Sequence, residues 1–450
     1  MSLIKNPPII PRMVYHIDTS RQSWHGAGIA ELNRSLEKDL KIMSHASNRR
    51  VFLGNLSAGV AGLVAAGHAS TARGFAANET LNLGCIGTGG RCRQLMKALG
   101  RVDGVRITAL CDIWDRSIEM ARELADPKAS VTKDYHELLA RKDVDAVVIG
   151  SPDHWHVPMT VDACAAGKDV YVEKPLTHDL SEGKAAIDAQ NKHRRIVQVG
   201  MQQRSMPHLQ KAYDIIRSGR LGTIYKVHLT WNRNSPRGQK KSYGIDPKSL
   251  DWKRFLGNAP DQPFDEYRFR HWRWFWDFGG GIFTDLMVHF IDVAHWFLDA
   301  EHPAVAVSIG DHFQWKDVWQ TPDTVQTLMR YPDRQVQVYF EGTFANARNA
   351  AMLEFMGTEA TLYADRGRYE IHPELRSEGK YEEYVLGQGT RGRDFYDKPD
   401  GEVLHLTNFV DCVRSRRKPN APAEAGVHAA AAAHLANQAL RSGQTAHWEA

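Results

Sequence analysis

Residues 81–92 read Leu-Asn-Leu-Gly-Cys-Ile-Gly-Thr-Gly-Gly-Arg-Cys, an apolar run that passes into a cluster of glycines. The apolar residues predict a short buried strand, and residues 91–100 are compatible with a helix. Glycines at such a junction permit a tight turn and bring backbone N–H groups, at the positive end of a helix dipole, close to a phosphate. The turn therefore predicts a dinucleotide site. Its candidate cofactor-binding residues are Gly87, Thr88, Gly89, Gly90 and Arg91.

The chain continues this alternation of strand and helix beyond the turn. Apolar runs at 105–111, 145–150, 169–172 and 195–199 predict strands, with helical segments between them. Strands that alternate with helices form a parallel sheet with right-handed crossovers. We expect a doubly wound Rossmann domain of the α/β class over residues 78–203.

Asp112 ends the second predicted strand, where a carboxylate can accept hydrogen bonds from a ribose hydroxyl and repel a 2′-phosphate. This favours NAD as the cofactor, while Arg116, one helical turn later, keeps NADP as the alternative. Cys92 occupies the third glycine position of the G-x-G-x-x-G pattern, a departure that affects helix packing rather than the turn.

From residue 204 the predicted strands become longer and mostly follow one another without helices between them. This pattern predicts a mainly antiparallel sheet with one packed face and one open face. A strong helix is expected at 281–298, polar loops at 366–402, and an Ala-rich terminal helix at 426–441. We expect residues 204–450 to form an α+β domain with a large open sheet, whose terminal helix returns to the Rossmann domain.

Glu173-Lys174-Pro175 follows the strand at 169–172, and ligands of open α/β sheets lie beyond the carboxyl ends of strands. A lysine at that position can donate a hydrogen bond to a reacting hydroxyl and stabilise the alkoxide that develops. An exposed turn is the alternative interpretation of these residues taken alone.

A second candidate lies at 279–292, where three glycines precede Asp285, His289 and Asp292. Asp285 and His289 are four residues apart and share one face of the predicted helix. We expect His289 to titrate near neutrality as a general base, and Asp285 to bind substrate or to orient that base. A structural Asp–His pair is the alternative.

Three motifs follow one another along the chain: the glycine-rich turn, Glu-Lys-Pro, and Gly-Gly-Gly-x-x-x-Asp-x-x-x-His-x-x-Asp. Through these motifs the sequence resembles the Gfo/Idh/MocA family of sugar oxidoreductases over roughly residues 80–445. The resemblance implies hydride transfer between nicotinamide and a sugar or cyclitol carbon, with Lys174, Asp285 and His289 as catalytic residues. It also implies a homo-oligomer, a dimer or tetramer, built on the open sheet. Further residues that it implies at the cofactor are Ser151, Pro152, His156, Glu173 and Lys174.

Four other residues are candidates for substrate contact. Gln203 and Arg204 follow the last strand of the Rossmann domain, and Arg273 and Trp274 lie in an aromatic run at 271–276. Aromatic rings bury the apolar faces of sugars, and a guanidinium binds hydroxyls or a carboxylate. Aromatic core packing is the alternative for this run.

The histidine and cysteine patterns predict neither a metal site nor a disulfide framework. His154-x-His156 has no third ligand at a useful spacing. The five cysteines are sparse and odd in number, and no CxxC pair occurs among them. Cys85 and Cys111 lie in apolar runs, so we expect them to be small buried hydrophobic residues.

The positive charge of the chain is concentrated at its N-terminus. Residues 1–77 hold nine Lys or Arg against four Asp or Glu, so the remaining charges nearly balance and no nucleic-acid surface is predicted. Residues 49–53, Arg-Arg-Val-Phe-Leu, resemble the start of a Tat export signal, and residues 51–72 contain no Asp, Glu, Lys or Arg. We expect a leader at 1–77, with Met43 as an alternative start, and a periplasmic or secreted protein exported by the Tat machinery.

Three functional hypotheses follow from these features. The first is an NAD(P)-dependent oxidoreductase that acts on a sugar, glycoside or cyclitol and holds its cofactor tightly. The second is a redox-neutral glycoside hydrolase that oxidises a sugar carbon transiently, eliminates the aglycone and regenerates its NAD. The third, a non-catalytic nicotinamide-dependent binding protein, is opposed by the intact set of Lys174, Asp285 and His289.

Overall fold

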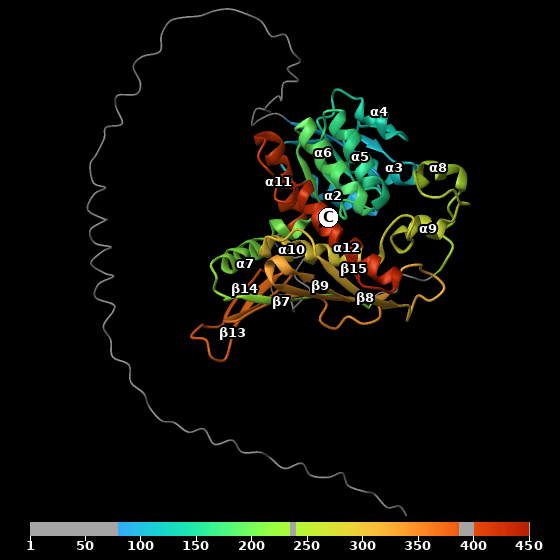
Figure 1. The fold of residues 1–450 in the computed structure, drawn as a ribbon. Helices are drawn as coiled ribbons and strands as arrows, with labels where there is room; N and C mark the ends of the chain where they lie inside the picture. Colours follow the sequence, from blue (N-terminus) through green and yellow to red (C-terminus); the bar gives the residue numbers. More distant parts are fainter. Residues whose placement is uncertain (1–79, 235–239, 387–399, 450) are drawn as a thin grey trace, which may run out of the picture. The chain divides into compact units, whose positions relative to one another are not determined.

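The structure, a computed structural model, describes residues 80–234, 240–386 and 400–449. These residues belong to one compact unit that contains two sheets, each with its own helices (Figure 1). The predicted leader at 1–77 lies outside the described residues.

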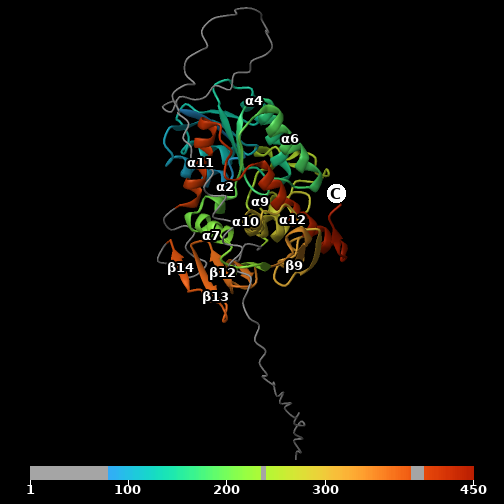
Figure 2. The ribbon, with the colours of Figure 1, turned by 60° about the vertical axis from the view of Figure 1, so that its left-hand side comes forward.

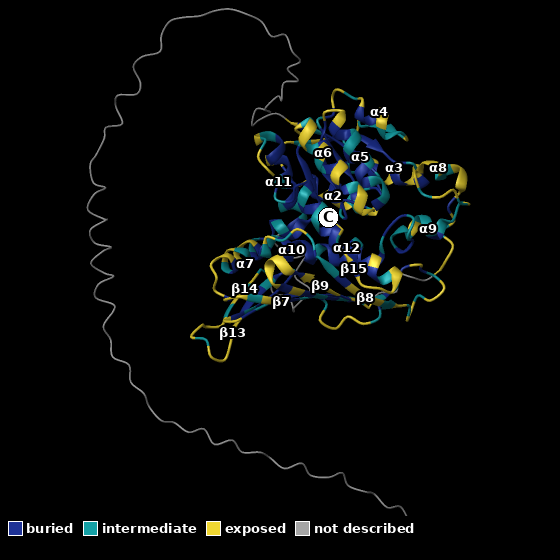
Figure 3. Cartoon of the chain, viewed as in Figure 1, coloured by how far each residue is buried: buried dark blue, intermediate teal, exposed yellow. Residues whose placement is uncertain are grey.

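The first sheet has six parallel strands in the order β3-β2-β1-β4-β5-β6, that of a doubly wound dinucleotide-binding fold. The side chains of its central strands are almost completely buried, as strands covered on both faces require (Figure 3). The predicted Rossmann sheet is confirmed. Its strands are β1 (Leu81–Ile86), β2 (Val105–Cys111), β3 (Ser130–Thr132), β4 (Ala146–Ile149), β5 (Asp169–Val172) and β6 (Val197–Val199).

Helices cover both faces of this parallel sheet. On one face, α2 (Gly90–Leu99) and α3 (Asp115–Arg122) share a core with α11 (Gly401–Ser415), a helix from far along the chain. On the other face lie α4 (Tyr135–Leu139), α5 (His156–Ala165) and α6 (Gly183–His193). The contribution of α11 was not predicted.

The second sheet has nine strands in the order β14-β13-β12-β11-β7-β10-β9-β8-β15, antiparallel except for the β7–β10 pair. The predicted mainly antiparallel sheet is therefore confirmed. Its strands are β7 (Ile224–Asn232), β8 (Val305–Asp311), β9 (Thr324–Tyr331), β10 (Val336–Thr343), β11 (Ala351–Gly357), β12 (Ala360–Asp365), β13 (Arg368–Pro373), β14 (Glu382–Val385) and β15 (Ala446–His447).

Strands β13 and β14 correct the prediction of loops throughout 366–402. Tyr369 and Ile371 of β13 are buried, but the strand also buries Glu370, which pairs with His372 at 3.0 Å. Charged residues inside a strand hide the usual alternation of apolar and polar side chains.

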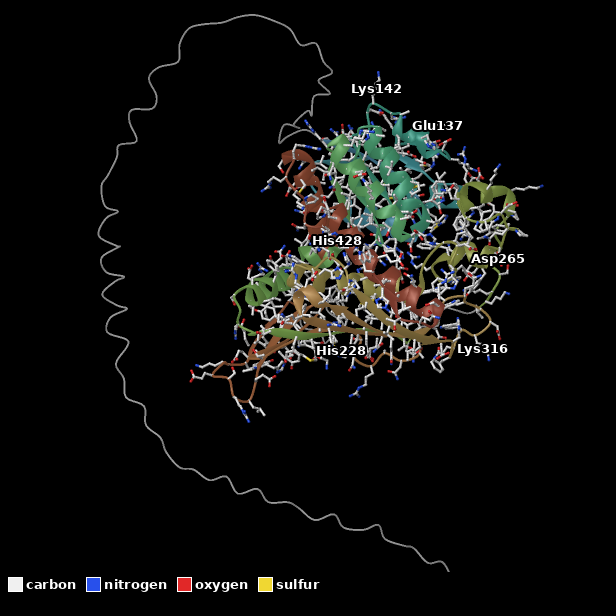
Figure 4. All side chains as sticks on the ribbon, in the orientation of Figure 1. Glu137, Lys142, His228, Asp265, Lys316 and His428 are labelled. Atoms are coloured by element: carbon white, nitrogen blue, oxygen red, sulfur yellow. The ribbon has the colours of Figure 1, made fainter. Side chains whose placement is uncertain are left out.

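One face of the second sheet packs against α7 (Pro207–Arg217), α10 (Val288–Leu298) and α12 (Ala423–Ser442), as Figures 1 and 2 show. The other face is open, and His228 of β7 points to it (Figure 4). The predicted terminal helix corresponds to α12, which also contacts α6 and β6 of the first sheet.

The helix expected at 281–298 is in two parts, a π-helix η6 (Phe283–Met287) followed by α10. π-Helical turns occur frequently at functional sites. The remaining short elements are η1 (Asp153–Trp155), η2 (Leu180–Glu182), η3 (Gln202–Ser205), η4 (Pro247–Ser249), α8 (Trp252–Leu256), α9 (Glu266–Arg270), η5 (Trp272–Trp274) and η7 (Pro332–Arg334).

Candidate active site

The glycine-rich turn joins β1 to α2, and its glycines differ in what they provide. Gly87 has a φ of +73°, and a Cβ atom there would lie 2.7 Å from the backbone N of Ser151. Glycine alone satisfies both conditions. A Cβ atom at Gly89 or Gly90 would instead meet no protein atom within 4 Å.

The open space beside the turn belongs to a cavity of about 430 Å³, which we call the glycine cavity. Gly90 is the first residue of the ten-residue helix α2, so the helix N-terminus forms part of the wall. A pyrophosphate fits there, because the first N–H groups of a helix lack helical partners and the glycines add no side chain. The predicted cofactor residues that line the cavity are Gly87, Gly89, Gly90, Arg91, Asp112, Ser151 and Pro152.

Asp112 lies in the wall of the glycine cavity and is held by two neighbours. The backbone N–H of Trp114 donates to its Oδ1 at 2.9 Å, and the Thr88 hydroxyl donates to its Oδ2 at 3.2 Å. Burial raises the pKa of Asp112 to about 6, against the effect of these bonds. Thr88 itself is fully buried and supports Asp112 rather than lining the cavity.

Cys92, the departure from the glycine pattern, packs closely against the end of β4. A Cβ atom at Gly150, which directly follows β4, would lie 2.8 Å from the Cβ of Cys92. The close packing of α2 against the sheet therefore requires a glycine at position 150 rather than at position 92. All five cysteines are buried and free, which confirms the prediction for Cys85 and Cys111.

Lys174 follows β5 and bonds directly to Asp285 in the π-helix. Its Nζ donates to the main-chain oxygen of Asp285 at 2.6 Å and to Oδ1 at 3.1 Å. Nε of Arg273 donates to the same Oδ1 at 3.1 Å. Although burial opposes ionisation, these two cations hold the pKa of Asp285 well below its usual range. Because an ammonium has three N–H groups, one remains on Lys174 for a ligand.

His289 lies at the start of α10, and its ring stacks on Trp231 with centroids 4.9 Å apart. Its Nδ1 atom is buried without a hydrogen-bond partner among the described residues. The described contacts contain no hydrogen bond between Asp285 and His289, since Asp285 bonds to Lys174 and Arg273. The structure thus places Asp285 as the partner of the lysine rather than of the histidine.

The expectation that His289 titrates near neutrality is wrong. Burial, and then the charges of Lys174 and Arg366, lower the pKa of His289 well below its ordinary value. The ring is consequently uncharged at neutral pH. An uncharged imidazole can accept a proton, so the role of general base stays a prediction for His289.

The lowered pKa predicts where the acid limb of the pH profile lies. Only neutral His289 accepts a proton, so turnover should stay constant as the pH falls through the ordinary histidine range and decline below it.

Protonation of Asp112 should act separately on the cofactor, because it should raise the KM for NAD as the pH falls to about 6. Both are measured as pH profiles of kcat and KM; a limb in kcat near neutrality that disappears in His289→Ala would contradict this account.

Lys174, Asp285 and His289 line a second cavity of about 590 Å³, the lysine cavity. Gly90, Arg91, Arg270 and Arg273 line both cavities, which therefore meet. A nucleotide in the glycine cavity and a small molecule in the lysine cavity would be neighbours. Other predicted residues that line the lysine cavity are Glu173, Gln203 and Trp274.

Arg91 is fixed between two carboxylates at the junction of the cavities. Its Nε donates to Glu173 at 2.9 Å, and its guanidinium also bonds to Glu402 of α11. Burial opposes the charge, yet the two carboxylates raise the pKa of Arg91 above its usual value. Glu402 was missed because 366–402 was interpreted as a loop.

Two predicted substrate residues in the lysine cavity are almost completely buried. Gln203 is 1% exposed, and both polar atoms of its amide lack partners among the described residues. Trp274 is 3% exposed and stacks on Trp319 with centroids 4.3 Å apart. Trp274 therefore belongs to the aromatic core as well as to the cavity wall.

His156 does not reach either cavity, which corrects its assignment to the cofactor. Its Nδ1 lies 2.6 Å from the Pro175 carbonyl oxygen and its Nε2 lies 2.9 Å from that of Ser151. The buried ring joins the turn after β4 to the turn after β5.

Arg204 is also placed away from the cavities, and its assignment to the substrate is corrected. Its Nε bonds to both carboxylate oxygens of Asp292, at 3.0 and 2.9 Å, and Nη2 bonds to Oδ1 at 2.8 Å. Asp292 is fully buried. Asp292 is the last aspartate of the Gly-Gly-Gly motif, and its ion pair with Arg204 joins α10 to η3.

Removing one partner of this buried ion pair should destabilise the fold. Arg204→Met leaves the Asp292 charge uncompensated, a change that costs about 3–5 kcal/mol. The double variant Arg204→Met/Asp292→Leu should recover part of that loss. Urea unfolding measures both. A normally stable Arg204→Met protein with a raised KM for carbohydrate would return Arg204 to the substrate site.

Several aromatic residues of the glycine cavity were not predicted. Their side chains come from the strand ends and from the segment around α8 and α9. The density of aromatic residues between 252 and 276 was a usable signal, of which only 271–276 was singled out. The unpredicted aromatic residues of the glycine cavity are Trp114, Tyr135, Trp155, Phe255 and Phe269, and Trp272 of the run at 271–276 also lines the cavity.

Within the ranges that the structure describes, no three His, Cys, Asp or Glu side chains gather in a way that could hold a metal ion. Across the same ranges, none of the helices combines the length and the apolar character needed to cross a membrane.

Sequence comparison agrees with this architecture. Residues 81–201 match the oxidoreductase family with an NAD-binding Rossmann fold, and residues 214–447 match its C-terminal alpha/beta domain. The two joined cavities thus lie in an NAD-dependent oxidoreductase. The chain belongs to the Gfo/Idh/MocA family, and the resemblance drawn from its motifs is confirmed.

Three proteins are similar to this chain in sequence or in fold. The chain is 26% identical over 325 residues to a scyllo-inositol 2-dehydrogenase (NAD(+)) of Bacillus subtilis, covering 71% of this chain and 81% of that protein. A glycosyl hydrolase family 109 protein of Solibacter usitatus is 36% identical over 140 residues, 29% of this chain and 32% of that protein. The fold matches levoglucosan dehydrogenase in complex with NADH and levoglucosan, with a TM-score of 0.64 and 17% identity over 82% of this chain and 99% of that one.

Proposed function

We propose that this protein oxidises a hydroxyl-bearing carbon of a sugar, glycoside or cyclitol and transfers the hydride to NAD. The observation that carries the proposal is the placement of Lys174 and neutral His289 in one cavity that joins the glycine cavity. Relatives support the substrate class, because one acts as a scyllo-inositol 2-dehydrogenase and another was solved with levoglucosan.

The side chains divide the reaction between them. The remaining N–H of Lys174 donates to the substrate hydroxyl oxygen and stabilises the alkoxide as its proton leaves. His289 accepts that proton. Asp285 positions Lys174, because its main-chain oxygen and its Oδ1 both accept hydrogen bonds from Nζ. NAD held in the glycine cavity would supply the hydride acceptor.

A redox-neutral glycoside hydrolase is the second candidate. The partial match to a glycosyl hydrolase family 109 protein supports it. In that reaction the same proton abstraction and hydride transfer would be followed by removal of the C–H proton beside the new carbonyl and loss of the aglycone. Water would then add to the double bond and the hydride would return to the carbonyl carbon, so no net NADH would form.

The two candidates are separated by one assay on freshly purified protein. Denaturation first identifies any nucleotide that remained bound, which we expect to be NAD. A panel of monosaccharides, glycosides and inositols is then tested for NADH formation and for aglycone release. Net NADH with an oxidised product supports the dehydrogenase, and aglycone release without net NADH supports the hydrolase. Neither signal from any compound would overturn both.

We further propose that the protein is exported by the Tat machinery to the periplasm or the medium. Arg49 and Arg50, on which this depends, lie outside the described residues. The double variant Arg49→Lys/Arg50→Lys should accumulate inside the cell. Normal export of that variant would exclude the Tat route.

A homo-oligomer formed through the open sheet is also proposed. Val307, Ile309 and Leu328 expose 46%, 65% and 56% of their surface on that sheet, and Val307 pairs across strands with Leu328. Leu328→Lys should shift the protein to a smaller mass in light scattering, whereas an unchanged mass would exclude this face as the interface.

A further inference from the structure

The carboxylates in the wall of the lysine cavity are already paired with cations. Asp285 accepts hydrogen bonds from both Lys174 and Arg273. Glu173 and Glu402 bond to the two sides of the Arg91 guanidinium. These three are the acidic residues that line the cavity in the described part of the chain.

Four further cationic residues line the same cavity. Arg233 directly follows β7 and Arg366 directly follows β12, so both lie at the ends of strands of the second sheet. Lys241 and Arg270 come from the segment between β7 and η6. A concave wall with an excess of one charge concentrates its field on whatever binds inside.

This charge does not serve the cofactor alone. Arg270 lines both cavities and so can act on a bound dinucleotide. Arg233, Lys241 and Arg366 line the lysine cavity and not the glycine cavity. Their charge therefore lies on the substrate side of the junction.

Two of these cations lie over the ring of Trp231, on which the proposed base stacks. The guanidinium carbons of Arg233 and Arg366 lie 5.3 and 5.4 Å from the ring centroid of Trp231, on which His289 stacks. Both arginines also interact with other groups of the chain, so they contribute charge at the wall rather than an unfilled bonding position. After burial and the charge of Lys174, the charge of Arg366 contributes to the lowered pKa of His289.

The buried polar side chain of Gln203 lies in the same cavity wall. Gln203 is 1% exposed, and neither its amide nitrogen nor its oxygen has a partner among the described residues. A buried amide without hydrogen bonds is costly, and a ligand hydroxyl or carboxylate in the cavity would satisfy it.

We propose that the substrate of the lysine cavity is a carbohydrate carrying an oxyanion, either a carboxylate or a phosphate ester, that is attracted by the positive charge of Arg366 and Arg233. Charge of one sign in a concave wall attracts either oxyanion, whatever other groups the two arginines contact. This inference rests on the proposed function and narrows its substrate from carbohydrates in general to acidic ones.

Binding to the protein loaded with NADH tests the inference without requiring turnover. Calorimetric titrations compare glucose with glucuronate, galactose with galacturonate, and glucose with glucose 6-phosphate. At least one acidic member should bind about tenfold or more tightly than its neutral partner, and higher salt should reduce the difference. A larger preference for the phosphate or for the carboxylate identifies the oxyanion.

Variants of Arg366 show whether this arginine causes the preference for the acidic carbohydrate. Arg366→Gln should reduce it by about fivefold or more, and Arg366→Lys should keep part of it. Arg122→Gln, on the exposed part of α3, is the matched control and should change nothing. NADH affinity should stay unchanged in all three variants, which shows that each is folded.

Equal or tighter binding of the neutral partners would overturn the inference, and so would the absence of binding by every pair. A preference that persists in Arg366→Gln would also overturn it. The proposed function is judged separately, by NAD reduction. An acidic sugar that binds tightly without reducing NAD would contradict that function and leave this inference standing.

Discussion

Lys174→Met should lower turnover by about 10²–10⁴-fold while the protein stays folded and still binds NAD. The substitution removes the N–H donor that stabilises the developing alkoxide, and positioned groups of this kind contribute on that scale. Asp285 keeps one cationic partner, because Nε of Arg273 bonds to the same carboxylate oxygen. Steady-state kinetics measure the loss, and thermal unfolding checks the fold.

The matched control is Lys184→Met, because Lys184 lies exposed on α6 and pairs with Asp188, one helical turn away. Its turnover should equal that of the wild type. If Lys174→Met keeps more than about a tenth of wild-type turnover, Lys174 does not stabilise the reacting oxygen.

Gly89→Leu should weaken NAD binding by at least about 100-fold without destabilising the protein. A Cβ atom at Gly89 meets no protein atom within 4 Å, and the φ of −60° suits any residue. The leucine side chain would instead occupy the glycine cavity, where the dinucleotide is expected to lie. Fluorescence titration with NADH measures the affinity.

Gly100→Ala, at the other end of the same helix, is the control for that change. Its Cβ atom would lie 3.4 Å from the nearest carbonyl oxygen and far along the chain from the turn. NADH affinity should be unaltered. Wild-type NADH affinity in Gly89→Leu would show that the cofactor does not use the N-terminus of α2.

The parallel sheet and its ligand turns could be predicted because local rules determine them. Apolar strands followed by glycines or by Lys174 indicate the carboxyl edge of a doubly wound sheet, and this pattern can be identified without knowing the structure of the rest of the chain. The Asp285–His289 spacing likewise placed both residues on one helix, and the structure brings both to one cavity.

Partners that are distant in sequence could not be predicted from spacing. Asp285 pairs with Lys174, 111 residues away, rather than with His289. Arg204 follows a Rossmann strand just as a ligand residue would, yet it pairs with Asp292, 88 residues later. Tertiary packing determines which of the possible partners are brought together, and the spacing of residues in a single sequence does not reveal this.

Burial likewise changes properties that a residue type alone suggests. Histidine is expected to titrate near neutrality, but His289 lies in a basic cavity wall and stays neutral. β13 was interpreted as a loop because it carries charged residues, of which Glu370 is buried and pairs with His372. Both errors concern ionisable groups whose surroundings form only in the folded protein.

The transfer of deuterium from a carbon-labelled substrate to the nicotinamide tests the central claim most directly. The protein is mixed with NAD and the substrate found in the panel, labelled at the carbon that is oxidised, and the dinucleotide is examined by mass spectrometry. We predict that the label appears in NADH during a single turnover and that Lys174→Met slows its arrival by about 10²-fold or more. NADH that forms without the label, or equally fast transfer by Lys174→Met, would contradict the account.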